Sequence, residues 1–138
     1  MTADQMGRHL FGYRLRAEQQ EIVAYRRGRL AVAAVPGSGK TLTLSLLAAR
    51  LILEGHIGAQ GEVLVVTVQN SAVINIAQRI RTILQSQRVP AVGYRVCTLH
   101  KLAADILRRR QDLAGVDNDL IIVDDAETGR LISRALST

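Results

Sequence analysis

The chain has 138 residues, 48% of them hydrophobic, and a net charge of +6. This length suits one domain or part of one, and no apolar run approaches the roughly 18 residues that span a bilayer. Since the start of the chain lacks a secretory signal pattern, we expect a cytoplasmic protein with no membrane partner. The single cysteine, Cys97, excludes an intrachain disulfide and is expected to be a buried structural thiol.

Charge is distributed unevenly along the chain. Residues 1–110 carry 16 basic and 6 acidic side chains, whereas residues 111–138 carry 2 and 6. This asymmetry favours a polyanionic partner for the first part. Solvated arginines are ordinary on protein surfaces, however. The charge alone therefore does not establish a polyanionic partner, and the positions of the basic residues are needed as well.

The first predicted elements are a short helix, a strand and a longer helix. The short helix is predicted at residues 17–27. Residues 30–35 are an unbroken run of small apolar side chains that ends at Pro36, a pattern typical of a strand covered on both faces. Residues 41–53 have apolar side chains nearly all round, as expected of a helix packed deep against a sheet.

Strand and helix patterns then alternate. Strands are predicted at residues 63–68, 94–99 and 120–123, each followed by an apolar stripe of helical spacing. The stripes consist of Ala72, Val73, Ile76, Ala77, Ile80, Ile83 and Leu84, then Leu99, Leu102, Ala103, Ile106 and Leu107, and finally Leu131, Ile132, Ala135 and Leu136. This alternation predicts right-handed βαβ units and a doubly wound α/β fold, with a parallel sheet and helices on both faces.

The segment AVPGSGKT, at residues 34–41, joins the first predicted strand to the helix that follows. A nucleoside triphosphate is best held by backbone N–H groups that converge from a tight loop and a helix start. Gly37 and Gly39 can adopt positive φ and leave room for phosphate. Lys40 can reach the β and γ phosphates, and Thr41 offers a hydroxyl to Mg²⁺. The candidate ATP-binding residues are Ala34, in the place of the first glycine of the pattern, Pro36, Gly37, Ser38, Gly39, Lys40 and Thr41, the last two also being catalytic candidates.

Upstream of this loop, LRAEQQEIV at residues 15–23 resembles the Q-motif of UvrD/Rep-like superfamily 1 DNA helicases. Phosphate loops also serve kinases, GTPases and transporters, so flanking motifs must distinguish among these functions. By this resemblance Gln19 would hydrogen-bond the edge of adenine, for which a carboxamide has the matching donor and acceptor. The alternative is a solvated glutamine on a helix.

Downstream of the second predicted strand, TVQNSAVINIAQRI at residues 67–80 is similar to motif Ia of the same family. The family's motif touches the backbone of single-stranded DNA, so the resemblance makes Thr67 and Asn70 candidate DNA contacts. Short polar side chains and a helix start suit phosphate, whereas base stacking needs aromatic rings. The family's aromatic residue is replaced here by Val68.

A third segment, TLHKLAADILRRR at residues 98–110, is similar to motif Ib of these helicases. Thr98 and His100 match the motif and are candidate DNA contacts by the resemblance, although a histidine at a helix start is more often a cap or partly exposed. Leu99 replaces another aromatic residue. With three Tyr and one Phe in the whole chain, DNA stacking by this part is expected to be poor.

Hydrolysis of ATP also requires one carboxylate for Mg²⁺ and a second to orient water. LIIVDDAE at residues 120–127 could supply them, with Asp124 at the metal and Asp125 as a shortened base. The alternative fits better, because Asp124 followed by Glu127 is a helix N-capping pattern. The resemblance places the true Asp-Glu motif further along than residue 138, so Lys40 and Thr41 would be half of an active site.

In order along nearly the whole chain, these segments resemble the N-terminal portion of a UvrD-like helicase ATP-binding domain, which we assign to residues 1–138. The resemblance implies a RecA-like P-loop NTPase lobe that binds ATP and Mg²⁺, with single-stranded DNA and the remaining helicase lobes as partners. It also implies 3′ to 5′ movement on DNA by a complete motor, as in DNA repair, and an inactive chain on its own. A non-catalytic nucleotide-binding or interaction module and a small-molecule phosphotransferase remain as alternatives.

Overall fold

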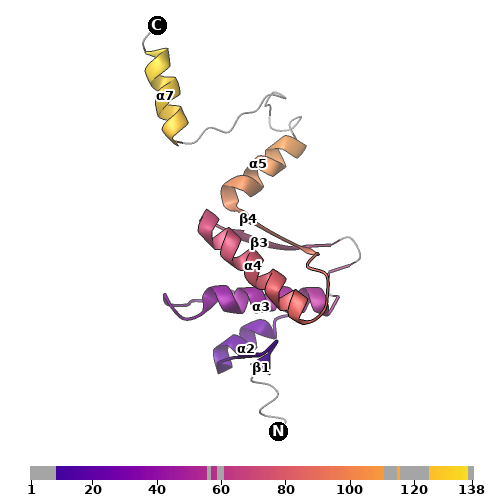
Figure 1. The fold of residues 1–138 in the computed structure, drawn as a ribbon. Helices are drawn as coiled ribbons and strands as arrows, with labels where there is room; N and C mark the ends of the chain where they lie inside the picture. Colours follow the sequence, from indigo (N-terminus) through magenta and orange to yellow (C-terminus); the bar gives the residue numbers. More distant parts are fainter. Residues whose placement is uncertain (1–8, 56, 59–60, 111–114, 116–124, 137–138) are drawn as a thin grey trace. The chain divides into compact units, whose positions relative to one another are not determined.

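The computed structural model describes residues 9–55, 57–58, 61–110, 115 and 125–136 of the chain (Figure 1). The chain divides into two compact units, Met1–Leu99 and His100–Thr138. None of the described helices is long and apolar enough to cross a membrane.

The first unit begins with a small antiparallel hairpin, which the sequence analysis missed. Strands β1 (His9–Leu10) and β2 (Tyr13–Arg14) pair across a two-residue turn. The turn residues Phe11 and Gly12 have φ of 51° and 84°, as the favoured hairpin turns require. Phenylalanine is a poor residue for positive φ. The side chain of Phe11 is nevertheless partly buried and packs against the core, together with Leu10 and Tyr13.

Helices and strands alternate through the rest of this unit, largely as predicted. They are α2 (Ala17–Val23), α3 (Lys40–Leu53), β3 (Val63–Thr67), α4 (Asn70–Ser86) and β4 (Tyr94–Thr98). Helix α2 is shorter than predicted, and the two strands each end one residue early. The periodicity of the apolar side chains therefore located these elements correctly.

Strands β3 and β4 form a parallel pair joined by α4, which confirms the predicted parallel βαβ arrangement for this segment. The register pairs Val65 with Val96 and Thr67 with Thr98. Both strands therefore end at the same edge of the sheet, with a threonine on each.

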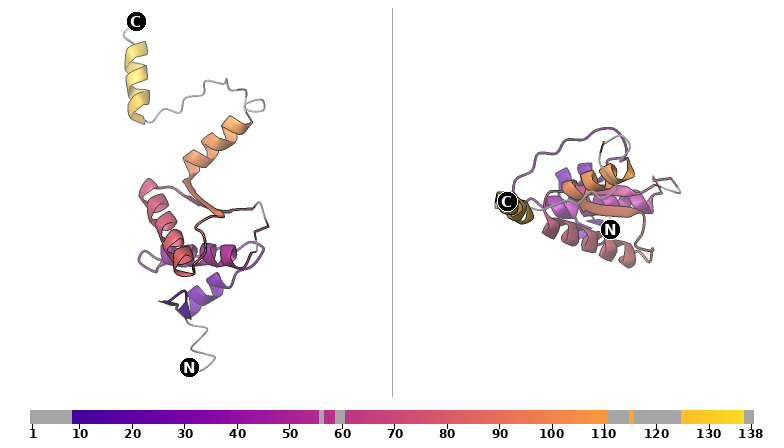
Figure 2. Two further views of the ribbon diagram at one scale, coloured as in Figure 1. Left: turned by 45° about the vertical axis from the view of Figure 1, so that its right-hand side comes forward. Right: turned by 90° about the horizontal axis from the view of Figure 1, so that it is seen from above.

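The core of the unit lies between the two long helices and one face of β3. Helices α3 and α4 lie against each other in both views (Figures 1 and 2). The buried core residues are Leu15, Val23, Leu46, Ala48, Ala49, Val65, Ile76, Ile80, Ile83 and Leu84. Burying the Leu, Ile and Val side chains among them stabilises the fold by roughly 1.5–3 kcal/mol each, and the predicted stripe of α4 supplies the largest share.

The opposite face of β3 is open in the part of the chain that the structure describes. Leu64 and Val66 alternate with the buried Val65, and both are exposed. Helices were predicted on both faces of the sheet. Among the described residues they cover only one face of the β3–β4 pair. The prediction was drawn from a near-continuous apolar strand, which does not reveal what covers each face.

The predicted buried strand at residues 30–35 is wrong. The segment forms no described strand, and Leu30, Val32 and Val35 are 52%, 49% and 71% exposed. A strand needs a neighbour that satisfies its N–H and C=O groups. Among the described residues, β3 pairs only with β4. The apolar run indicated burial, but an apolar composition does not reveal whether a neighbour for its backbone exists.

The second unit contains helix α7 (Asp125–Ala135) and most of α5 (Leu99–Arg109). Both helices were predicted from their apolar stripes. On α5, Lys101 and Asp105 form an ion pair of 3.2 Å with i,i+4 spacing. The predicted strand at residues 120–123 and the capping or metal-binding roles of Asp124 lie outside the described residues.

Candidate functional site

The segment predicted to bind phosphate is a tight loop that leads into α3. Gly37 and Gly39 have φ of 76° and 89°, and α3 begins at Lys40. These positive φ values are the reason for glycine at both positions. The first N–H groups of a helix have no carbonyl partner within it, so this helix start directs free donors toward the loop.

Lys40 folds back over the loop in this structure. Its Nζ donates hydrogen bonds to the carbonyl oxygens of Ala34 at 3.2 Å and Val35 at 2.8 Å, and its side chain is exposed. Ala34 and Pro36 are exposed as well. The carbonyl oxygen of Ala34 thus accepts a hydrogen bond from Lys40, and its methyl group is exposed to solvent.

Ser38 provides the clearest sign that the loop is built for a ligand. Its Oγ is buried and has no hydrogen-bond partner among the residues described. Buried hydroxyls are nearly always hydrogen-bonded. A phosphate oxygen would accept from this hydroxyl, so the donors at the loop fit the anionic group predicted from the sequence.

Gln19, predicted from the Q-motif, lies directly against the loop. A Cβ added to Gly39 would come within 2.9 Å of Gln19 Nε2. Gln19 Nε2 donates to Thr43 Oγ1 at 3.0 Å, and its Oε1 accepts from the Arg16 N–H at 3.0 Å. Helix α2 and the start of α3 therefore bring the predicted base contact and the predicted phosphate contacts into one place.

Thr41, the predicted Mg²⁺ ligand, is half-buried in the first turn of α3. Its backbone carbonyl accepts a hydrogen bond from Ser45 Oγ at 2.8 Å. Among the residues searched there is no group of three or more His, Cys, Asp or Glu side chains that could hold a metal ion. The Thr41 hydroxyl as a ligand of Mg²⁺ therefore stays a prediction from the sequence.

Three of the predicted DNA contacts lie at or just after the ends of β3 and β4. Thr67 and Thr98 are neighbours in the sheet register, and Asn70 is the first residue of α4. His100 is exposed on α5 in the second unit. The structure thus brings Thr67 and Thr98 together at one edge of the parallel pair.

Val68 and Leu99, which replace the aromatic residues of the resembled motifs, are 76% and 57% exposed. Each directly follows one of the paired threonines. Their exposure agrees with positions that carry a contact residue, yet aliphatic side chains provide no ring on which a base could stack.

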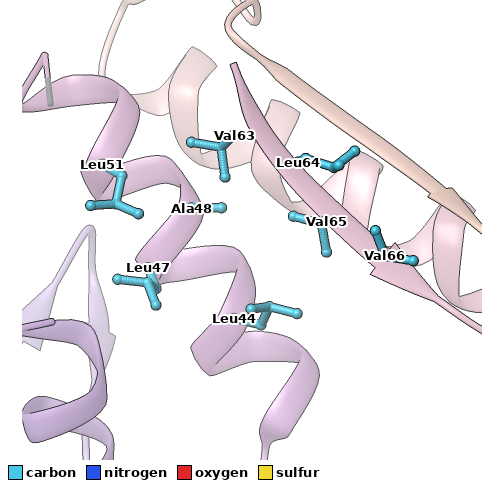
Figure 3. A pocket seen from close by; sticks show the side chains of 8 residues that line it. All are labelled: Leu44, Leu47, Ala48, Leu51, Val63, Leu64, Val65 and Val66. Atoms are coloured by element: carbon cyan, nitrogen blue, oxygen red, sulfur yellow. The ribbon is translucent and has the colours of Figure 1, made fainter. Parts of the chain in front are cut away.

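A groove between α3 and β3 is a poor candidate for the nucleotide site. It has a volume of about 260 Å³ and is lined by Leu44, Leu47, Ala48, Leu51, Val63, Leu64, Val65 and Val66 (Figure 3). The lining side chains carry no hydrogen-bonding group, and a triphosphate needs several. The polar loop before α3 remains the candidate site.

Two residues of the site were not singled out from the sequence. Arg16 contributes a backbone N–H, which no side-chain pattern can reveal. Thr43 and Ser45 are the buried polar residues that the structure describes in α3. A buried threonine two residues after the loop was the available signal, because buried hydroxyls require partners.

Comparison with known proteins identifies the family. A family model described as UvrD/REP helicase N-terminal domain matches residues 15–138. The chain is 34% identical over 109 residues to the ATP-dependent DNA helicase PcrA of Bacillus subtilis, covering 79% of this chain and 14% of that protein. It is 33% identical over 123 residues to DNA helicase II of Haemophilus influenzae, covering 88% and 17%.

A eukaryotic relative shows the same relation. The chain is 34% identical over 103 residues to the ATP-dependent DNA helicase SRS2 of Saccharomyces cerevisiae, covering 75% of this chain and 9% of that protein. The chain therefore spans less than a fifth of the length of these relatives. The loop before α3, the adjoining Gln19 and the matched profile all agree, and the chain belongs to the UvrD/REP helicase N-terminal domain family.

Proposed function

We propose that the chain is the ATP-binding part of an ATP-dependent DNA helicase of superfamily 1, within a RecA-like P-loop lobe. The family match and the names of the relatives support this function. The observation that carries it is the loop of Gly37 to Gly39, where two positive φ angles and an unpartnered Ser38 hydroxyl precede a helix start. Such a loop holds phosphate through backbone N–H groups.

Each residue of the loop has a role in this proposal. Lys40 exchanges its two carbonyl partners for β and γ phosphate oxygens, since a charged acceptor forms the stronger hydrogen bond. Thr41 presents its hydroxyl to Mg²⁺, which neutralises phosphate charge when bound. Gln19 binds the edge of adenine through its carboxamide.

Single-stranded DNA is the proposed partner of the polar edge formed by Thr67, Asn70 and Thr98. His100, which belongs to the second unit, is proposed as a separate DNA contact. Helix α4 has no acidic residue in its first turn, and its sequence carries only arginine as a charged residue. A helix start without acidic groups attracts phosphate. Contacts of this kind position a nucleic acid strand without reading its bases.

We further propose that the 138-residue chain binds ATP without hydrolysing it appreciably and does not unwind DNA. Asp124 acts in this proposal as a helix cap rather than as a metal ligand. The catalytic carboxylates, and a second lobe that closes over the nucleotide, are then supplied by the remaining helicase lobes. In that assembly, closure driven by ATP moves the strand.

ATP binding can be measured on the purified chain. Its two lysines, Lys40 and Lys101, provide a test variant and a matched control. Lys40→Ala should weaken binding of a fluorescent ATP analogue by about 10- to 100-fold, the loss of a hydrogen bond to a charged group. Lys101→Ala removes the same charge from an exposed ion pair on α5 and should leave binding unchanged. Equal affinity in the two variants would refute the assigned phosphate loop.

ATP turnover tests the remainder of the proposal. The 138-residue chain should release no phosphate above background, with or without oligo-dT. Turnover that depends on DNA and is lost in Lys40→Ala would instead make Asp124 a catalytic residue. If the chain stays inactive after fusion to the remaining lobes of a relative, a non-catalytic nucleotide-binding module becomes the better description.

A further inference from the structure

A continuous chain of three hydrogen bonds runs from the start of α2 to the phosphate loop. The Arg16 N–H donates to Gln19 Oε1 at 3.0 Å, and Gln19 Nε2 donates to Thr43 Oγ1 at 3.0 Å. Thr43 Oγ1 then donates to the Gly39 carbonyl oxygen at 3.0 Å. The middle bond joins residues 24 positions apart in the sequence, so it exists only in the folded chain.

The chemistry of the end groups dictates the direction of this chain of hydrogen bonds. A backbone N–H can only donate, so the carboxamide oxygen of Gln19 must face Arg16. The carboxamide nitrogen therefore faces Thr43, whose hydroxyl accepts this hydrogen bond and donates its own to the Gly39 carbonyl oxygen. Thr43 is 5% exposed, so water cannot readily replace its hydroxyl.

A carboxamide has two N–H groups and two oxygen lone pairs. The hydrogen-bond chain uses one of each on Gln19, which is only half-buried. One donor and one acceptor remain for a ligand, and their positions are fixed because the carboxamide cannot flip without breaking both bonds. Arg16 and Thr43 thus determine which free position of the Gln19 carboxamide donates and which accepts.

This fixed pair distinguishes the two purine bases. Adenine presents an acceptor at N7 beside an amino donor, whereas guanine presents acceptors at both N7 and O6. A fixed donor beside a fixed acceptor matches adenine, but places an oxygen lone pair against guanine O6. Without the Thr43 hydroxyl, the carboxamide is held only through its oxygen by the Arg16 N–H, so its NH₂ group can pivot and donate to O6 while the oxygen stays away from N7.

We propose that Thr43 is a specificity-determining positioning residue that makes the site prefer ATP to GTP. Its hydroxyl fixes the carboxamide of Gln19, and Gln19 binds the base. The inference rests on the proposed nucleotide-binding function and deepens it, because it assigns base selectivity to a residue that need not touch nucleotide. The bond to the Gly39 carbonyl ties that selectivity to the phosphate loop itself.

Binding of three probes to the 138-residue chain separates base recognition from phosphate recognition. The probes are ATP, GTP and inorganic tripolyphosphate, measured by calorimetry. Thr43→Val keeps the shape of the side chain and removes the hydroxyl. It should lower the ratio of ATP to GTP affinity about fivefold, the effect of one hydrogen bond, and leave tripolyphosphate affinity unchanged. Thr43→Ser should restore the ratio.

Gln19→Ala provides a second variant that removes no buried hydroxyl. It should abolish the preference for ATP, and adding Thr43→Val to it should change the ratio no further. A parallel fall in affinity for all three probes in Thr43→Val would show a structural role only and overturn the inference. Tripolyphosphate binding by the unaltered chain without preference for ATP over GTP would overturn it too, while leaving the phosphate loop intact. Binding of none of the probes would refute the proposed function itself.

Discussion

Arg50 on α3 donates a hydrogen bond from Nη1 to the backbone carbonyl of Val23, the last residue of α2. The other edge of the guanidinium holds Glu54, with Nε–Oε1 and Nη2–Oε2 distances of 2.7 and 2.9 Å. Helix α2 has no basic residue in its own last turn. Arg50 therefore supplies the cation that the C-terminal end of a helix favours.

This contact should stabilise the first unit. The Arg50 side chain is 11% exposed, and hydrogen bonds from a charged group to a buried carbonyl contribute about 1.5–3 kcal/mol. Arg50→Met should therefore lower the free energy of unfolding in urea by about 2 kcal/mol. Arg79 is a matched control because it is exposed and its Nε donates to the nearby Asn75 on the same helix. Arg79→Met should change stability by less than about 0.5 kcal/mol, and equal losses would contradict the assigned role of Arg50.

Three glycines allow backbone strain to be separated from a steric clash. Gly39 has φ of 89° and no room for a Cβ, Gly37 has φ of 76° with open space, and Gly58 has open space without a positive φ. Gly39→Ala should be the most destabilising, because it adds contact with Gln19 to about 1–2 kcal/mol of strain. Gly37→Ala should carry the strain alone, and Gly58→Ala should be nearly neutral.

The order of unfolding midpoints in urea checks this prediction. The same variants should rank in the same order for ATP affinity, since both strained positions lie in the phosphate loop. A Gly58→Ala chain as unstable as Gly39→Ala would show that general loss of glycine, rather than φ or contact, governs the loop.

A substitution at the start of α4 should move stability and DNA binding in opposite directions. Asn70→Asp adds an acidic group to a first turn that has none. It should raise the free energy of unfolding by about 0.3–1 kcal/mol through the helix dipole. The same charge should weaken single-stranded DNA binding severalfold, because it lies where phosphate is proposed to bind. Anisotropy of a labelled oligo-dT at fixed salt measures the second effect.

Gln85→Glu is the matched control for this change. It adds the same charge to the last turn of α4, at an exposed position. The dipole there disfavours an acidic group, so stability should fall slightly while DNA binding stays nearly constant. An equal loss of DNA binding in both variants would mean that net charge, not the start of α4, governs the interaction.

The local elements and the two positive-φ glycines of the loop could be predicted from the sequence alone. Helical and strand periods are properties of neighbouring residues, so α3, β3, α4, β4 and α5 lie within a few positions of their predicted bounds. The phosphate loop was predictable for the same reason, since two glycines, a lysine and a threonine at fixed spacing already define it. The alternation of elements predicted a parallel sheet, whereas the register that pairs Thr67 with Thr98 came from the structure.

The contacts between segments far apart in the sequence could be seen only in the folded structure. The apolar run at residues 30–35 resembles a buried strand, yet its backbone finds no described neighbour and its side chains are exposed. Phe11 takes a positive φ in the hairpin turn while its side chain packs on the core. The contacts of Gln19 with Thr43 and of Arg50 with Val23 join residues 24 and 27 positions apart. No local pattern encodes such pairs, because their geometry depends on how α2 packs against α3.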